Sequence, residues 1–440
     1  MSEISANDGV TAVPEPLIAP TQVTPAAAAT HPGGPHQKSS WRVGLAVMVG
    51  GPLWIGPFVA GMTVLIPVQL GSIAPDQKVG LLAFVSAIGA IVAFAANIFF
   101  GALSDRTRSR FGRRAPWMIF GSLAAGGLML LMSVVTSLTA IIVVWTAFTF
   151  FLNAIVATMV TLIPDRVGPE RRGTYSALYG TGILVGAGIG GIVAANFVQN
   201  VSGGYVVLGI AVLLAGPVVT LIAPDRSNKG EPRIPLSAGT LLSTFSFPRR
   251  GARDYYFALV GKLMIVIATY MITGYQLYVV TDYIGLDLAA AGALIATMGG
   301  IQLGLSLVFG LIAGPISDKI GRRKILVIVA ALVIAAASII PFVWNNPIAM
   351  LIYAAVGLGI GSGVFNSVDQ ALNYDVLPNA GTAAKDLGIL NMANGGGQII
   401  GPILMATIVG VTGGYAIGFI TSAVLCVLGA FIIHRIRGAR

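Results

Sequence analysis

Two charged side chains fall inside long apolar runs of the sequence. Lys262 lies about two helical turns into one run, and Asp369 lies about two turns before Asp375, where another run ends. Because a charge inside a membrane costs at least about 2.5 kcal/mol, such residues are candidates for function. The two runs are expected to be antiparallel, which places both residues at a similar depth. We predict an ion pair or a protonatable network at the end of a path through the membrane. The alternative is that Lys262 reaches the headgroups while Asp369 caps a helix end.

A second set of charged residues lies in two related loops between apolar runs. The first polar loop, residues 101–114, reads GALSDRTRSRFGRR, and the second polar loop, residues 314–323, reads GPISDKIGRR. Their GxxSD cores are 213 positions apart and their GRR ends are 209 apart, so the first loop carries a four-residue insertion. The aspartate of each loop can face a helix N-terminus of the other half of the chain, where the helix dipole favours an anion.

These polar loops are predicted to act as a conformational latch. Their arginines can pair with Asp165 or Glu170, and such contacts would stabilise closure of the cytoplasmic side. The alternative is that the loops only determine membrane topology. The predicted latch residues are Gly101, Asp105, Arg113, Arg114, Asp318, Arg322 and Arg323.

The composition is that of a membrane protein. Of the 440 residues, 56% are hydrophobic and only 10% are charged, and the mean hydropathy is +0.87. Such a chain has too little polar surface to cover a soluble globule. The net charge of +10 does not indicate nucleic-acid binding, because the basic residues lie in short loops between apolar runs. The single cysteine, Cys426, excludes a disulfide within the chain and a cysteine metal cluster.

Twelve runs are long enough to cross a bilayer as helices, which predicts an all-α integral membrane protein. Positively charged loops mark the cytoplasmic side, and 24 of the 26 Lys and Arg residues fall on one side. Both termini of this multi-pass protein are therefore expected in the cytoplasm. The predicted spans are 44–67, 79–102, 115–135, 139–163, 174–198, 204–223, 255–280, 288–313, 325–344, 348–372, 386–411 and 415–434.

The repeated polar loop divides the chain into two parallel six-helix repeats. Residues 1–41 are predicted to be a disordered cytoplasmic tail, and they lack the apolar core of a signal peptide. Residues 42–224 are predicted to form the N-terminal half, 225–254 a cytoplasmic linker, and 255–440 the C-terminal half. Within the linker, residues 236–247 are predicted to form either a short helix on the inner leaflet or plain coil.

The two GxxSD and GRR loops, one in each half, resemble the signature loop of the major facilitator superfamily. The resemblance covers nearly the whole chain from Arg42 onward and implies the twelve-helix fold of that family. The stretch DRTRSRFGRRAPW at 105–117 more narrowly resembles the glycoside, pentoside and hexuronide cation symporters and the plant sucrose–proton symporters. Residues 375–394 are similar to bacterial members of the sucrose-transporter-like group. These resemblances imply sugar uptake across the cytoplasmic membrane of a bacterium.

One departure from the resembled families concerns the coupling ion. Melibiose-type symporters carry carboxylates in their second and fourth spans that coordinate a cation. The first half of this chain has no Asp or Glu inside a predicted span, which argues against sodium coupling.

In the resembled superfamily the first, fourth, seventh and tenth spans usually line the central cavity, and polar side chains gather in these spans here. A sugar site needs hydrogen-bond donors and acceptors together with an aromatic face. For each residue the alternative is packing, interface anchoring or a helix-to-helix hydrogen bond. With two residues of the eleventh span added, the predicted substrate-binding residues are Trp54, Trp145, Asn153, Gln276, Asn366, Asn391 and Asn394.

Glycines spaced by four residues, as at Gly182, Gly186 and Gly190, predict close approach of helices. No nucleophile with a base, metal-ligand cluster or phosphate-binding loop stands in the sequence, so neither an enzyme nor a cofactor or metal is predicted.

The predicted function is secondary active transport by a monomer that works by alternating access. The small-molecule substrate is expected to be a sugar or glycoside, moved in symport with protons across the lipid bilayer. The alternative is a proton-driven exporter of a hydrophobic drug or natural product, which the nearly carboxylate-free first half favours.

Overall fold

The computed structural model describes residues 41–230, 248, 252–378 and 383–438. These residues form helices joined by turns and loops. The predicted tail and the predicted helix at 236–247 lie outside the described residues. The first helix group consists of α1 (Trp41–Ala60), η1 (Gly61–Leu65), α2 (Ile66–Ile73), α3 (Lys78–Arg106), α4 (Ala115–Leu131), α5 (Leu138–Arg166), η2 (Pro169–Arg171), α6 (Arg172–Ala195) and α7 (Val201–Ile222).

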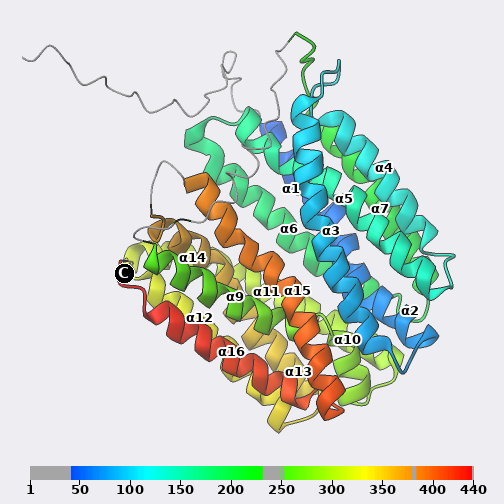
Figure 1. The fold of residues 1–440 in the computed structure, drawn as a ribbon, viewed down its shortest axis with the longest axis vertical. Helices are drawn as coiled ribbons and strands as arrows, with labels where there is room; N and C mark the ends of the chain where they lie inside the picture. The colour runs from blue at the N-terminus through cyan, green and yellow to red at the C-terminus, as the bar shows by residue number, and fades with distance from the viewer. Residues whose placement is uncertain (1–40, 231–247, 249–251, 379–382, 439–440) are drawn as a thin grey trace, which may run out of the picture.

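The second helix group follows from residue 253. It consists of α9 (Arg253–Thr273), α10 (Gln276–Tyr278), η3 (Val279–Tyr283), α11 (Leu288–Ile320), α12 (Arg323–Val343), α13 (Pro347–Ile352), η4 (Tyr353–Gly361), α14 (Ser362–Asp375), α15 (Ala383–Thr412) and α16 (Ala416–His434). Figure 1 shows the first group, coloured blue to green, beside the second group, coloured green to red. The domain limits proposed from the sequence stay predictions.

The described part of the chain contains eleven helices that are long and apolar enough to cross a membrane. A shorter apolar helix, α4, lies where the third span is predicted, and it ends early because residues 132–134 form a turn. The prediction of an all-α membrane protein is therefore confirmed. The count of twelve spans and the orientation of the termini stay predictions.

Close helix contacts occur where glycine removes the side chain. Helix α1 packs along α6. A Cβ added at Gly190 would overlap the Gly56 carbonyl oxygen, and one added at Gly186 would overlap Pro52. The glycine spacing thus lets the two backbones touch, as expected for small residues between membrane helices.

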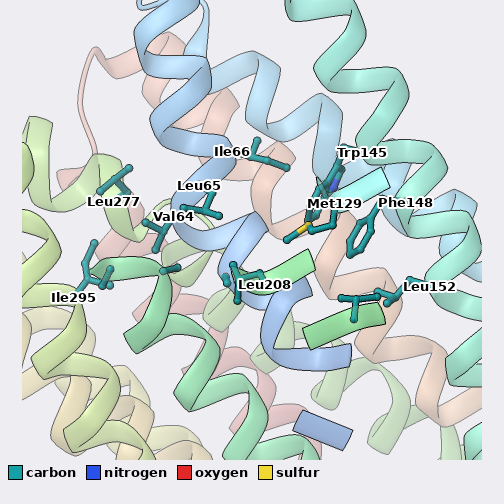
Figure 2. Packing of buried hydrophobic residues seen from close by; sticks show 14 of the residues in the cluster. Val64, Leu65, Ile66, Met129, Trp145, Phe148, Leu152, Leu208, Leu277 and Ile295 are labelled. Carbon is teal, nitrogen blue, oxygen red and sulfur yellow. The ribbon is translucent and has the colours of Figure 1, made fainter. Parts of the chain in front are cut away.

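The largest apolar core extends from one helix group into the other. Figure 2 shows its side chains, with Val64 and Leu65 of η1 on the same side as Leu277 of α10 and Ile295 of α11. Trp145 of α5 lies in the same core and is fully buried. This core holds the two groups against each other over part of their length.

We call the end of the helices that carries the two polar loops the basic end, and the end that carries Lys78 and Asp282 the opposite end. Helix α6 packs on α11, and α3 packs on α15. In the first of these contacts, Gly292 near the start of α11 faces Val198 just beyond the end of α6. Val198 is 5% exposed, so this contact between the groups is buried.

The seventh span differs from its prediction as one continuous helix over 255–280. Helix α9 ends at Thr273, and Tyr275 leaves the helical region with φ −111° and ψ 16°. The amides of Gly274 and Tyr275 close the helix by donating to the carbonyls of Tyr270 and Ile272 over 3.0 and 3.1 Å. Gly274 lies next to Pro402 and has a low propensity to continue a helix.

The glycine contact between α1 and α6 gives a stability prediction. Gly190→Ala should destabilise the protein by about 1–3 kcal/mol, because its Cβ meets backbone that cannot move aside. Gly191→Ala is the matched control, since no atom lies within 4 Å of a Cβ added there. Thermal unfolding of the two variants in detergent measures the difference, and equal unfolding temperatures would contradict the packing argument.

Candidate functional site

The structure brings the two charged residues of the membrane interior together. Lys262 of α9 and Asp369 of α14 form an ion pair with Nζ and Oδ2 2.6 Å apart, and their side chains are 2% and 6% exposed. The Asn373 amide donates to the same Oδ2 atom over 3.0 Å. In this conformation Lys262 points to Asp369 inside the protein.

The other charged residues of the described membrane helices lie close to the helix ends. Within the described residues, Lys262 is the only basic residue, and Asp369 the only acidic residue, that lies more than one turn from the end of a membrane helix. Removing one partner of a buried pair costs about 3–5 kcal/mol, because the other charge is left without compensation. A change of charge at Asp369 must therefore change how α9 and α14 pack.

Polar side chains of α14 and α15 lie toward the basic end. Asn366, Gln370 and Asn391 are exposed, and Asn394 is half-buried. Gln370 Nε2 donates to Asn391 Oδ1 over 3.5 Å, which links the two helices. Amides exposed to lipid would be costly, so these polar side chains on membrane helices are candidates for function.

A second polar link joins α15 to α9. Gln398 Nε2 donates to the Tyr270 hydroxyl over 3.3 Å, and Tyr270 is 37% exposed. Gln398 follows Asn391 and Asn394 at helical spacing, which already made it a substrate candidate in the sequence. The predicted substrate-binding residues did not include Gln370 or Tyr270. We call Tyr270, Asn366, Gln370, Asn391, Asn394 and Gln398 the polar face.

The remaining predicted substrate residues lie apart from the polar face. Trp145 is fully buried and stacks between Phe58 and Phe148, with ring centroids 6.1 and 4.7 Å away. In this conformation Trp145 packs in the apolar core, and the predicted sugar contact stays a prediction. The sequence could not distinguish the two because both require an aromatic ring on an inward helix face.

The surroundings of the other three predicted substrate residues lie within their own helix groups. Asn153 is 8% exposed and donates to the Thr149 carbonyl one turn earlier over 2.8 Å. Gln276 directs Nε2 at the Met298 sulfur over 3.6 Å. Trp54 is half-buried, and its indole Nε1 has no hydrogen-bond partner among the described residues.

The first polar loop is held by a network of charges inside its own helix group. Arg114 is 4% exposed. Its guanidinium contacts Asp105 over 2.7 Å and Asp165 over 3.0 Å, and it donates to Ser104 Oγ over 2.5 Å. Arg113 pairs with the other oxygen of Asp165 over 2.5 Å. The expected pairing of loop arginines with Asp165 is present in the structure.

The second polar loop is similar but more open. Arg323 bridges Asp318 over 2.8 Å and Asp375 over 2.7 Å, and Arg322 is exposed. These partners belong to the same helix group. In this conformation Asp105 and Asp318 therefore pair with arginines of their own group, whereas the sequence predicts a helix N-terminus of the other half.

The inserted residues of the first polar loop dock onto the chain that follows α7. Asn228 is buried, accepts from the Ser109 amide over 2.9 Å, and donates to the Thr107 carbonyl over 2.8 Å. Asp225 pairs with Arg166 over 2.8 Å. Gly112 has φ +81°, and a Cβ there would overlap the Asp225 carboxylate. We call this arrangement the loop clasp, and nothing in the sequence pattern pointed to it.

Apolar membrane helices in two groups, with related charged loops and a buried ion pair, define a multi-pass membrane transporter. The chain belongs to the Major Facilitator Superfamily, whose family model matches residues 53–296 and 259–438.

The comparisons add one relative by sequence. The chain is 24% identical over 288 residues to the probable nitrate transporter NarT of Staphylococcus haemolyticus, which covers 64% of this chain and 70% of the relative.

Several solved structures share the fold. A peptide transporter POT in complex with sulfate has a TM-score of 0.70 at 13% identity, covering 90% of this chain and 94% of that chain. A D-xylose–proton symporter has a TM-score of 0.66 at 14% identity, covering 90% and 97%. A bacterial homologue of the human lysosomal transporter Spinster, inward-facing and unoccupied, has a TM-score of 0.65 at 13% identity, also covering 90% and 97%. At these identities the likeness shows the fold alone.

The loop clasp gives a local prediction. Gly112→Ala should destabilise it by about 1–2 kcal/mol, because a residue with a Cβ is strained at positive φ and would also meet Asp225. Limited trypsin digestion at the loop arginines should then become faster. Gly173→Ala at the same end, where a Cβ meets no atom within 4 Å, should leave the digestion rate unchanged. Unchanged cleavage in Gly112→Ala would show that the clasp does not hold the loop.

Proposed function

We propose that the chain is a secondary active transporter that imports a sugar or glycoside together with protons by alternating access. The observation that carries this proposal is the buried ion pair between Lys262 and Asp369. The pair joins α9 to α14 within the second helix group, next to the polar face. This position supports a role in linking a proton to a change in helix packing.

Asp369 is proposed as the residue that takes the coupling proton. Protonation removes its charge, and the Lys262 ammonium then loses the carboxylate that compensates it in a buried position. Asn373 bonds the same carboxylate oxygen, so its contact changes as well. A proton thus changes which arrangement of α9 and α14 is the more stable, which is what coupling requires.

An uncharged, hydroxyl-rich substrate fits the polar face. Each amide of Asn and Gln supplies both donors and an acceptor, which suits the hydroxyls of a sugar. The one interior cation, Lys262, is already neutralised, so an anion such as nitrate would find no free positive charge there among the described residues. We propose Asn366, Asn391 and Asn394 as substrate ligands in this conformation. Trp54, Trp145, Asn153 and Gln276 would contribute only after rearrangement.

The basic end is proposed to face the cytoplasm of the cell, with both termini there and α4 as the third of twelve spans. The abundance of arginine in its loops supports this orientation. The buried contacts at the opposite end then close the outside, and the exposed polar face opens inward. The predicted latch residues of the two polar loops would close the basic end in the other half of the cycle.

Export of a hydrophobic compound is the second candidate. Among the described residues, the carboxylates of helices α1 to α7 all lie in the last turn of a helix. An apolar cargo bound in that half would need no carboxylate partner. The two functions differ in direction, since export would give resistance to a toxic compound without accumulation of sugar.

The proposed coupling is tested in proteoliposomes with a panel of labelled disaccharides and glycosides. In the wild type, a proton gradient should drive accumulation of at least one of them. Asp369→Asn should reduce the accumulation ratio by about tenfold or more, within the usual range of coupling between sites, while exchange of substrate without a gradient persists. Full accumulation by this variant would remove Asp369 from the mechanism.

Two further variants separate coupling from loss of fold. The double variant Lys262→Gln with Asp369→Asn keeps a neutral hydrogen-bonding pair and should fold, yet remain uncoupled. Asp76→Asn removes an exposed carboxylate at the opposite end and should transport like the wild type. If no sugar is accumulated by any form, but a hydrophobic compound is expelled, export is the function.

A further inference from the structure

We propose that Lys78 and Asp282 form an ionic lock that holds the two helix groups together at the opposite end, and that the transport cycle must break it. Lys78 is the first residue of α3 in the first group, and Asp282 lies in η3 of the second group. Their Nζ and Oδ2 atoms are 2.7 Å apart. The proposal goes beyond the proposed function, because it does not depend on which substrate or ion is carried.

Two tyrosines of the second group reinforce the lock. The Tyr275 hydroxyl donates to the Val79 carbonyl over 2.8 Å, and the Tyr278 hydroxyl donates to the Pro67 carbonyl over 2.9 Å. Lys78 Nζ also lies 4.8 Å from the centre of the Tyr278 ring, within the range of a cation–π contact. These polar contacts between the groups therefore meet α2 and the start of α3.

Asp282 is oriented by its own helix group before it meets Lys78. The Thr281 hydroxyl donates to Oδ1 over 2.9 Å, and the Tyr415 hydroxyl donates to Oδ2 over 3.3 Å. These two bonds fix the direction of the carboxylate, so that little side-chain freedom is lost when the lock closes.

The short helix η3 is also anchored to its neighbours. Tyr283 donates to the Pro341 carbonyl over 2.9 Å and accepts at its own carbonyl from Asn345 over 2.9 Å. Burial raises the pKa of Tyr283, so its hydroxyl stays protonated and continues to donate. Asp282 is thus presented from a rigid support.

The lock lies over a dry interface. Tyr275, Leu277 and Tyr278 are at most 2% exposed, whereas the lock side chains themselves are 22% and 31% exposed. The apolar contacts below the lock exclude water, but they have no direction and gain from any close packing. The charged pair at the edge of this interface does have a direction, so it fixes how the two helix groups are aligned with each other.

Partial exposure suits a lock that must open in each cycle. Ion pairs that water can reach shift an equilibrium by about two- to fivefold and do not fix it. Removing the pair should therefore shift the population toward the state that is open at the opposite end without unfolding either group. A reversed pair should restore the original balance, because attraction does not depend on which group carries which sign.

The test uses a cysteine that becomes accessible only when the opposite end opens. Val198→Cys places a thiol against Gly292 of the other group, at a position that is 5% exposed. The native Cys426 is buried and provides the background rate. The full chain is reconstituted in liposomes, and a membrane-impermeant maleimide is added on the side of Lys78.

The charge variants are made in this Val198→Cys chain. Lys78→Asp and Asp282→Lys should each raise the labelling rate by about two- to tenfold, as expected when an attractive pair becomes repulsive. The double variant that exchanges the two charges should label at close to the starting rate. Asp76→Lys, which changes a neighbouring exposed carboxylate, should have no effect.

Each outcome decides the proposal. Recovery in the exchanged pair supports the lock, and thermal unfolding of every variant checks that faster labelling does not come from loss of fold. Single variants that label at the starting rate, or an exchanged pair that labels as fast as the single variants, would overturn it.

Discussion

A lysine and an aspartate remain inside the membrane helices of this protein because each neutralises the other. The bilayer offers no water to hydrate a charge, so Lys262 and Asp369 must stay paired or change their charge together with their surroundings. Since the pair joins α9 to α14, the packing of the second helix group depends on it.

The protein thus contains two Lys–Asp pairs with different consequences. The pair of Lys262 and Asp369 is buried within one helix group, where losing one charge is costly and the other must respond. The pair of Lys78 and Asp282 joins the two groups at a partly exposed edge, where the loss of an ion pair costs little free energy. The proposed coupling therefore uses the buried pair, and the proposed lock uses the exposed pair.

Much of the architecture could be predicted because it depends on local patterns. Long apolar runs gave the helices, and glycines at Gly186 and Gly190 gave a backbone contact that the structure contains. Arg113 and Asp165 could be paired in advance, because loops on the same side of a membrane bring their charges together. The depth of Lys262 and Asp369 followed from counting turns.

Other features could not be predicted because their partners are not marked by residue type. Tyr275 and Tyr278 bind backbone carbonyls, which every residue has, so no sequence pattern identifies Val79 or Pro67 as acceptors. Asn228 joins residues more than a hundred positions earlier through the same kind of bond. Trp145 has the residue type of a sugar platform, and only its surroundings assign it to packing.

The loop clasp explains why the two polar loops are not equivalent. The side chain of Arg114 in the first loop is 5% exposed, whereas that of Arg323 in the second is 30% exposed. The inserted residues of the first loop bond to Asn228, which ties this loop to the chain that follows α7. The second loop has no such insertion. A latch that forms across the basic end would therefore have a fixed side and an adaptable side, and the adaptable side is the one whose group carries the buried pair.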